Sequence, residues 1–488
     1  MGRFGVLRQP CVIPTFSLSG AKARSRLPAN SASPSGRDGG RKDPFIQIPG
    51  TFSFMRYDPI QSKLFVENRR RLAALMQPRT LAVVNNNDVL PTNADGSFPL
   101  RPSSDLFYLT GIEQEESILV LFPQAKEPRD REILFIREPK PLLEVWEGRK
   151  LTKEEAKKIS GIERIAWVED FPAIFRALMC ECDGAYLNAN EHARAVVVTE
   201  TREARFVKAC KEEYPLHQYH RLARLLHQLR PVKSEIEVNL IRKATAITRD
   251  GFERVARYVR PGVTETEVEA EYAHEFIRQG GQFAYTPIIG SGANACALHY
   301  IQNDGPCRDG EMLLLDVASS YANYNSDLTR TIPVNGKFSR RQRQVYDAVV
   351  RVFHQCAAMV KPGLTPAAWR KATDEFMEKE LVDLKLLKPA EVKKQGPDKA
   401  AVKKYYMHGI GHPIGLDVHD VALLHEPMQA GWVVTCEPGI YIREEKLGVR
   451  VENILLLTED GNIDLMEDIP LEAKEVEALM ASPARRRR

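Results

Sequence analysis

The amino-acid sequence predicts an α/β (α+β) protein, in which an N-terminal α/β domain precedes a pseudo-twofold α/β domain with a central site. Three observations predict this fold class. The chain has 488 residues, more than one ordinary hydrophobic core supports, so at least two domains are expected. Strand-like and helix-like runs alternate through residues 55–215. In the C-terminal half, "VRPGVT" at 259–264 is repeated as "VKPGLT" at 360–365, which indicates a duplication.

The composition excludes several classes of protein. The chain is 43% hydrophobic and 27% charged, as globular domains are, and it contains no run of about 18 apolar residues that would predict a membrane span. Its net charge of +4 comes from its two ends, 1–50 and 485–488, where Lys and Arg are in excess. The body between them is mildly acidic, so neither nucleic acid nor a membrane is expected as a partner. Eight scattered cysteines without a CxxC pair indicate reduced thiols.

Residues 1–54 are expected to be a disordered leader. They are rich in Arg, Ser, Gly and Pro, poor in acids, and lack the apolar stretch of a secretory signal. The favoured interpretation is an extension ahead of a translation start at Met55, with the protein in the cytoplasm. The alternative is a transit peptide, which would make the protein mitochondrial. Residues 483–488 are interpreted as a solvated basic tail.

The N-terminal domain is expected to span residues 55–220. Its first element is a helix, because Ile60, Leu64, Leu72 and Leu75 form an apolar stripe with helical spacing. Later apolar runs predict buried strands, and the charged or amphipathic runs between them predict helices. The predicted strands are "TLAVVNN", "DLFYLTGI", "SILVLFP" and "EILFIRE", and the predicted helices are "KEEAKKI" and "AIFRALM".

The second domain is expected to span residues 221–482. Residues 216–259 are predicted to be mostly helical and broken near Pro231, with Ser234 as the cap of the second helix. Histidines in helical stretches are interpreted as ordinary structural residues; these are His217, His220, His227 and His354.

The repeated segments predict a duplicated helix–helix–sheet unit. Each follows a long predicted helix and precedes another helix, which carries "EFI" at 275–277 or "EFM" at 375–377. Each unit then continues into a strand-rich run with a histidine, His299 in the first and His408 in the second. The matched order of these features predicts the pseudo-twofold arrangement.

The first unit carries a pair of aspartates. Asp316 and Asp327 lie in strand-like runs at equal distances from Tyr321 and Ala322, so a turn at that point would place them opposite one another. Asp316 follows "MLLL", a run too apolar for the surface. Two carboxylates this close repel unless a cation or a shared proton lies between them.

The second unit carries a matching pair of glutamates. Glu437 and Glu452 are equidistant from the sequence 444–445, and Arg450 shares the strand face of Glu452. Four acids on two hairpins, with histidine nearby, suit two divalent ions such as Mn²⁺ better than a structural zinc.

The run "YMHGIGHPIGLDVHD", residues 406–420, holds His408, His412 and His419. The first two are four residues apart, as in a helical zinc motif, but the intervening glycines and Pro413 prevent a stable helix. The run is therefore expected to be a strand or loop, and its three rings need not converge on one ion.

These residues resemble the pita-bread metallopeptidases, and within them the Xaa-Pro aminopeptidases (aminopeptidase P). The resemblance covers roughly residues 55–480 and implies an aminopeptidase P-like N-terminal domain followed by a pita-bread catalytic domain. The matching runs are "SSDLFYLTGIEQEESILVLFP", "ALHY", "LLLDVASSYANYNSDLTRTIPVNGKF", "MHGIGHPIGLDVHD", "CEPGIYI" and "GVRVEN".

The resemblance also implies roles for individual residues. Asp316 is expected to chelate one ion, Asp327 and Glu452 to bridge both ions, and His412 and Glu437 to bind the other. The expected catalytic residues are His299, His408, His419, Glu437 and Arg450, and the three histidines of this set are also expected to bind substrate.

The implied function is a dimetal aminopeptidase that hydrolyses the N-terminal Xaa-Pro bond of peptides through a metal-bridging hydroxide. Mn²⁺ is the expected metal, with Zn²⁺, Co²⁺ or Fe²⁺ as alternatives, and a homodimer or homotetramer is expected. Two other functions remain open: a prolidase restricted to Xaa-Pro dipeptides, and a non-catalytic binding protein on the same fold. The sequence departs from the family pattern at Cys436, at Asn453 and in the short connection "REEKL".

Overall fold

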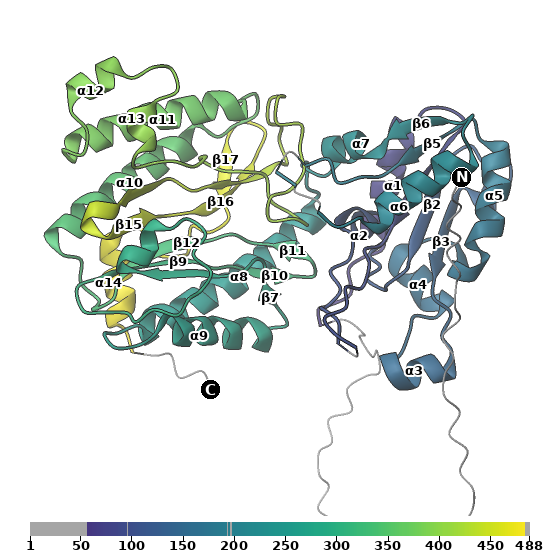
Figure 1. Ribbon diagram of the computed structural model, residues 1–488, viewed down its shortest axis with the longest axis horizontal. Helices are drawn as coiled ribbons and strands as arrows, with labels where there is room; N and C mark the ends of the chain where they lie inside the picture. Colours follow the sequence, from purple (N-terminus) through teal and green to yellow (C-terminus); the bar gives the residue numbers. More distant parts are fainter. Residues whose placement is uncertain (1–55, 95, 193, 196–197, 484–488) are drawn as a thin grey trace, which may run out of the picture. The chain divides into compact units, whose positions relative to one another are not determined.

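The computed structural model describes residues 56–483 except positions 95, 193 and 196–197 (Figure 1). The described residues belong to one compact unit, Ser53–Arg488. The predicted leader 1–54, the proposed start at Met55 and nearly all of the tail 483–488 lie outside the described residues. Within the described part of the chain, no helix is long and apolar enough to cross a membrane.

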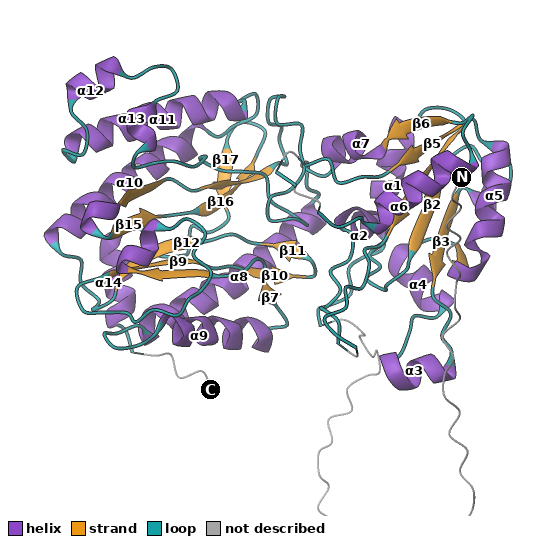
Figure 2. Ribbon diagram, in the orientation of Figure 1, coloured by secondary structure: helices purple, strands orange, loops and turns teal. Residues whose placement is uncertain are grey.

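The N-terminal half is built on a six-stranded mixed sheet (Figure 2). The strand order is β4-β3-β2-β1-β5-β6, in which β2 runs antiparallel to both of its neighbours and the remaining pairs are parallel. Its strands are β1 (Thr80–Asn85), β2 (Ile118–Leu121), β3 (Glu132–Ile136), β4 (Arg164–Trp167), β5 (Gly184–Leu187) and β6 (Gln218–Arg221).

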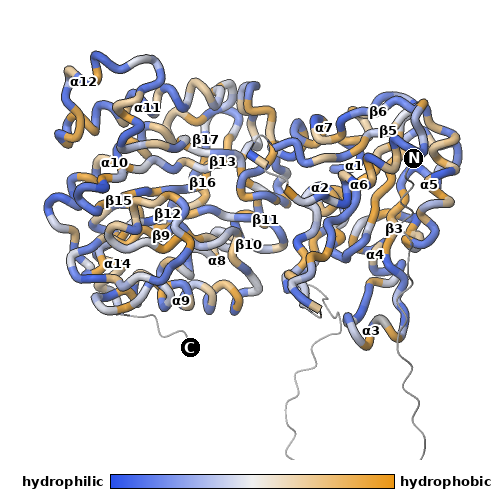
Figure 3. Tube along the Cα trace, viewed as in Figure 1, coloured by the Kyte–Doolittle hydropathy of each residue, from blue (hydrophilic) through white to orange (hydrophobic). Residues whose placement is uncertain are grey.

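Helices accompany this sheet along the chain. The central strands β1 and β2 are buried along their whole length, and their sequences are therefore continuous apolar runs. The neighbouring strand β3 is also coloured as hydrophobic in Figure 3. The helices are α1 (Lys63–Leu75), α2 (Ser104–Thr110), α3 (Pro141–Glu147), α4 (Lys153–Ser160), α5 (Phe171–Glu181), α6 (Arg202–Glu213) and α7 (Leu222–Leu229).

Most predicted elements of this half are confirmed, but the strand predicted at "DLFYLTGI" is wrong. Helix α2 occupies that run, with Ser103 accepting a hydrogen bond from the Leu106 amide at its start and Gly111 in the left-handed conformation at its end. The residues from Leu106 to Thr110 are all buried. A short helix buried on every side shows no polar face, and its sequence therefore resembles a buried strand.

The prediction that residues 216–259 are mostly helical also needs a correction. Gln218–Arg221 forms β6, the edge strand of the sheet, so His220 lies on a strand and not on a helix. Leu216 and His217 lie in the turn before this strand, so His217 does not lie on a helix either. The helical prediction is confirmed for α7 and for residues 235–258. Ser234 caps α8 (Glu235–Tyr258) through a reciprocal capping box with Glu237, which confirms the predicted cap.

The C-terminal half contains the predicted duplication. Helices α8 and α9 (Glu265–Arg278) precede the first set of strands, and α10 (Arg340–Met359) and α11 (Pro366–Asp383) precede the second. Thr264 and Thr365, the last residues of the repeated segments, cap α9 and α11, and each side chain accepts a hydrogen bond from the amide three residues later. Helix α8 contacts β10 and β11, whereas α10 contacts β13, β14 and β15, so each helix pair packs on the strands of its own unit (Figure 1).

Small antiparallel sheets form the centre of this half. The first unit contains the three-stranded sheet β12-β9-β8, and the second unit contains the three-stranded sheet β13-β16-β17. The strands are β7 (Gln282–Phe283), β8 (Ile288–Ser291), β9 (Met312–Asp316), β10 (Ser319–Tyr321), β11 (Tyr324–Asn325), β12 (Thr329–Pro333), β13 (Val433–Cys436), β14 (Gly439–Ile442), β15 (Leu447–Arg450), β16 (Asn453–Leu457) and β17 (Asn462–Asp464). The remaining helices are α12 (Pro389–Lys394), α13 (Ala400–Lys403) and α14 (Ala473–Ala481).

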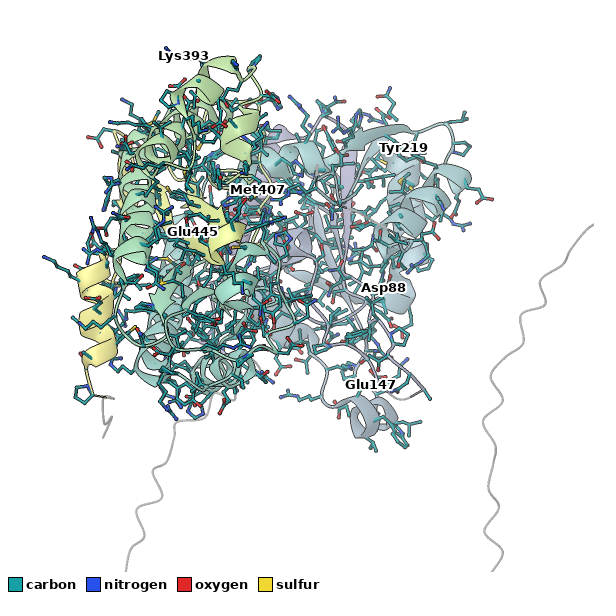
Figure 4. All side chains as sticks on the ribbon, turned by 60° about the vertical axis from the view of Figure 1, so that its left-hand side comes forward. Asp88, Glu147, Tyr219, Lys393, Met407 and Glu445 are labelled. Atoms are coloured by element: carbon teal, nitrogen blue, oxygen red, sulfur yellow. The ribbon has the colours of Figure 1, made fainter. Side chains whose placement is uncertain are left out.

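The glutamate hairpin has the predicted register. Gly439 pairs with Arg450 in one ladder and Cys436 pairs with Asn453 in the next, so Glu437 and Glu452 occupy opposite positions in the gap between the two ladders. The turn lies at Arg443–Glu445, as predicted, and Glu445 is labelled in Figure 4.

The aspartate hairpin differs from its prediction by two residues. Asp316 pairs with Thr329 and not with Asp327, because the turn lies at Ala322–Asn323, one position later than expected. Both turn residues have positive φ angles, 51° and 65°. A shift of two residues preserves the face on which a strand residue projects. The two aspartates therefore still approach one another, but diagonally.

Candidate metal centre

All nine predicted site residues line one cavity in the C-terminal half. Its volume is about 460 Å³, which is within the usual range for a ligand site. The predicted residues that line it are His299, Asp316, Asp327, His408, His412, His419, Glu437, Arg450 and Glu452. Four of these are carboxylates and one is a guanidinium. Arg194 adds a second guanidinium, so the lining has a formal charge of −2 before any histidine is protonated.

Three of the predicted metal ligands converge. One ligand atom each from Asp327, His412 and Glu452 lie within 4.8 Å of one another. The Nε2 atom of His412 is 3.5 Å from Asp327 Oδ2 and 3.6 Å from Glu437 Oε1. On its other side, the ring of His412 donates from Nδ1 to the Pro413 carbonyl at 3.0 Å. This bond fixes the tautomer and leaves the Nε2 lone pair directed at the carboxylates, as in histidines that bind metal.

Asp316 approaches the same centre from the other side. The Tyr285 hydroxyl lies 2.5 Å from Asp316 Oδ1 and 2.7 Å from Asp327 Oδ1, and Arg450 donates from Nη2 to Asp316 Oδ2 at 2.5 Å. The Tyr285 hydroxyl has one proton for two carboxylates. The remaining carboxylate oxygen is left without a donor from that group, and a cation would satisfy it.

The pKa values indicate how strongly these acids repel one another. Burial raises the pKa of Glu437 to about 7, against the opposing effects of His412 and Arg450. Burial, followed by repulsion from the neighbouring acids, raises the pKa of Glu452 well above its usual value. Burial also raises the pKa of Asp316, against the opposing effect of Arg450. Burial would lower the pKa of His412, but Asp327 and Glu437 raise it. Hard oxygen ligands with one imidazole, crowded in this way, fit divalent cations.

His408 has a tautomer that is fixed by its hydrogen bonds. Its Nδ1 donates to the Gly409 carbonyl at 2.8 Å, so its Nε2 accepts from the Tyr441 hydroxyl at 2.9 Å. Tyr441 in turn accepts from Arg450 Nη1 at 2.7 Å. Loss of hydration, followed by the charge of Arg450, lowers the pKa of His408 to about 3. The ring therefore presents a neutral, fixed wall to the cavity.

His419 has the opposite tautomer. Arg194 Nη1 lies 2.8 Å from its Nδ1, and a guanidinium can only donate, so Nδ1 accepts and the proton of the neutral ring is on Nε2. The ring stacks on His412 with centroids 3.8 Å apart. His419 therefore offers a donor to the cavity. His299 also lines the cavity, and its side chain is exposed.

A buried cluster of ion pairs stabilises the position of the segment that carries His412 and His419. Arg230 donates to Asp417 at 2.8 Å, to Asp420 at 2.5 Å and to Asp105 of the N-terminal half at 2.7 Å. Lys233 adds a second cation on Asp420 at 2.9 Å. Buried pairs of this kind are costly to break because one charge is left uncompensated.

Sequence reasoning missed three residues of this centre. Tyr441 follows Glu437 by four positions on a β-strand, so alternation of side-chain direction was a usable signal for it. Tyr285 lies in the loop between β7 and β8, and Arg194 lies after β5 in the other half of the chain. No local pattern connects either of these two residues with the carboxylates.

Comparisons with known proteins agree with this geometry. Residues 239–459 match metallopeptidase family M24, and residues 65–186 match the aminopeptidase P N-terminal domain. An Xaa-Pro aminopeptidase of Haemophilus influenzae is 33% identical over 85% of this chain and 96% of its own length.

Two solved structures have the same fold over nearly their whole length. A putative aminopeptidase P from Bacillus anthracis is 31% identical with a TM-score of 0.80, over 86% of this chain and 98% of that one. The zinc-substituted Escherichia coli aminopeptidase P in complex with product is 31% identical with a TM-score of 0.77, over 87% and 99%. The chain therefore belongs to the Xaa-Pro aminopeptidases of metallopeptidase family M24 and is a metal-dependent exopeptidase with a pita-bread catalytic domain.

Proposed function

We propose that the chain is a dimetal Xaa-Pro aminopeptidase that removes the first residue of peptides with proline in second position. The observation that carries the proposal is the cavity in which four carboxylates and four histidines lie together with two guanidinium groups, those of Arg194 and Arg450. A charge of this sign and density has no evident structural purpose, because it opposes folding unless cations bind.

The five side chains that would hold the ions are Asp316, Asp327, His412, Glu437 and Glu452. Asp327 and Glu452 contribute to the tightest group of ligand atoms, which suits residues shared by two ions. Mn²⁺ is the metal proposed, since oxygen ligands predominate. When bound, two such ions lower the pKa of water toward neutrality and so supply the nucleophile.

The other residues of the site bind the peptide and move protons. Glu437 is the proposed general base, which takes a proton from the attacking water and passes it to the leaving proline nitrogen. The His419 Nε2–H is the donor for the carbonyl oxygen of the scissile bond, on which negative charge develops. The neutral wall of His408 suits proline, whose nitrogen has no N–H in a peptide and which must be recognised by shape.

The same proposal has three further parts. The domain division is 55–220 and 221–482, the protein acts in the cytoplasm, and it assembles as a homodimer or homotetramer. Size-exclusion chromatography with light scattering measures the last of these directly.

The decisive experiment compares peptide lengths. The full-length protein loaded with Mn²⁺ should release the first residue from Ala-Pro-Ala, and it should leave Ala-Ala-Ala, the matched control, largely intact. Cleavage of Ala-Pro alone would identify a prolidase instead, and no cleavage of any of the three would contradict the proposed function.

A further inference from the structure

A second cavity adjoins the first one. Its volume is about 480 Å³, compared with about 460 Å³ for the cavity that holds the carboxylates. The two cavities share Arg194, His408, Gly409, Gly411, His412 and His419 in their linings. A ligand that passes His408 from the first cavity therefore enters the second without crossing the protein interior.

The shared segment leaves room for such a passage. A Cβ atom built on Gly409 would meet no other atom within 4 Å, so the backbone at this residue faces open space. Gly409 lies between His408 and the metal-facing His412 on a segment without regular secondary structure. Its small size therefore keeps the connection between the two cavities wide.

The second cavity has the opposite electrostatic character to the first. None of the residues that line it is an aspartate or glutamate, whereas two are arginines, Arg194 and Arg370. Neither guanidinium forms an ion pair with any carboxylate of the described chain, although most arginines that pair in this protein do so within about 3 Å. Apolar side chains complete the lining, among them Trp369, Met428 and Trp432.

Both arginines keep donors available for a ligand. Arg194 uses Nη1 for its hydrogen bond to His419, and a guanidinium has five N–H groups in a planar fork. Arg370 lies on α11, and its side chain is exposed. A planar fork of this kind is well suited to the two oxygens of a carboxylate.

We propose that the second cavity binds the part of the peptide that follows the proline, and that Arg194 and Arg370 bind a carboxylate there. The carboxylate is either the C-terminus of a short peptide or the side chain of an acidic residue. This inference rests on the proposed function, because the peptide N-terminus must lie at the metal centre for the chain beyond proline to pass His408. It assigns a preference for short or acidic peptides to this protein.

The test compares matched peptides that differ in one charge. Ala-Pro-Ala with a free C-terminus is compared with its C-terminal amide, and Ala-Pro-Glu amide is compared with Ala-Pro-Gln amide. In the unmodified protein, KM for each charged peptide should be about tenfold lower than for its neutral partner, with little change in kcat. The first pair reports on the C-terminus and the second on the acidic side chain.

The protein variants assign this preference to the two arginines. Arg370→Gln and the double variant Arg194→Gln/Arg370→Gln should bring the KM ratio of charged to neutral peptides toward 1. Arg260→Gln, which removes an exposed guanidinium outside both cavities, is the control and should keep the ratio. The ratio is the readout because Arg194→Gln also removes the contact to His419, which would slow all substrates alike.

The outcomes separate this inference from the function on which it rests. Equal KM values for charged and neutral peptides in the unmodified protein, or a ratio that survives in the double variant, would overturn the carboxylate subsite while Xaa-Pro cleavage stands. A protein that cleaves neither Ala-Pro-Ala nor its amide would overturn the proposed function and the subsite with it.

Discussion

The two repeats of the C-terminal half hold their carboxylates in different ways. In the first repeat, Asp316 and Asp327 are offset by two positions, and the Tyr285 hydroxyl fills the space between them. In the second repeat, Glu437 and Glu452 occupy opposite positions in the gap between two ladders. Both repeats thus present two carboxylates on a β-hairpin, but only the aspartate pair is bridged by the Tyr285 hydroxyl.

Contacts between the repeats compensate for this difference. Arg450 of the second repeat pairs with Asp316 of the first, and Thr329 of the first donates to Glu452 of the second at 2.7 Å. His412 of the second repeat faces Asp327 of the first. Neither repeat therefore has a complete set of ligands or partners, and the centre exists only where the two meet.

The largest expected effect comes from removing one shared carboxylate. Asp327→Asn keeps the shape of the side chain but removes a charge from the tightest group of ligand atoms, so kcat/KM for Ala-Pro-Ala should fall by about 10³-fold or more. Asp309→Asn, which alters an exposed acid in the same repeat, should retain full activity. Near-normal turnover by the Asp327 variant would mean that the two repeats do not share ions through this residue.

A second prediction concerns stability against pH. For Glu437 the folded pKa of about 7 lies above the ordinary 4.5, so the folded state binds a proton that the unfolded state releases. This contribution to the stability of the metal-free protein should therefore be fully present below about pH 4.5 and be lost as pH rises to about 7. Asp316, Glu452 and His412, whose pKa values are also raised, act in the same direction.

Metal binding should reverse this trend, because the ligands must lose their protons to bind ions. Thermal unfolding followed from pH 4.5 to 7.5, with EDTA and with Mn²⁺, measures both slopes. A melting temperature of the EDTA-treated protein that rises with pH over this range would contradict the assignment of repulsion to the carboxylate centre.

The smallest expected effect lies at the matching helix caps. Thr264→Ala removes a capping box in which Glu267 also takes part, whereas Thr365→Ala removes a single side-chain hydrogen bond to the Ala368 amide. Each variant should lower the free energy of unfolding by about 1 kcal/mol, with the larger loss at Thr264. Urea unfolding measures this difference, and the corresponding Thr→Ser variants should stay close to the unmodified protein. A larger loss at Thr365 would show that the number of capping hydrogen bonds does not determine the contribution of each cap to stability.

Sequence reasoning succeeded where the determinants were local or periodic. The repeated segments, the capping by Ser234 and the register of the glutamate hairpin all follow from spacing along the chain. The nine predicted residues line one cavity, although the roles assigned to them stay predictions. The turn at Ala322–Asn323 escaped prediction because it has none of the glycine that usually marks a turn with two positive φ angles.

Long-range contacts were beyond the reach of sequence patterns. Arg194 reaches His419 across 225 positions, and Tyr285 reaches Asp327 across 42. The prediction for α2 failed for a different reason. Because this helix is buried on all faces, its sequence lacks the hydrophobic periodicity that distinguishes a helix from a strand.

The ion cluster around Arg230 limits how freely this protein can be recombined. Asp105 from the first half holds Arg230, which in turn holds Asp417 and Asp420 beside His419. Arg194 makes a second connection of this kind. A chimera that joins this catalytic half to the N-terminal half of a relative would have to supply an acid and a guanidinium at the same two positions. Because of these two contacts, we expect that the N-terminal half cannot be exchanged for that of a relative without loss of the positioning of His419.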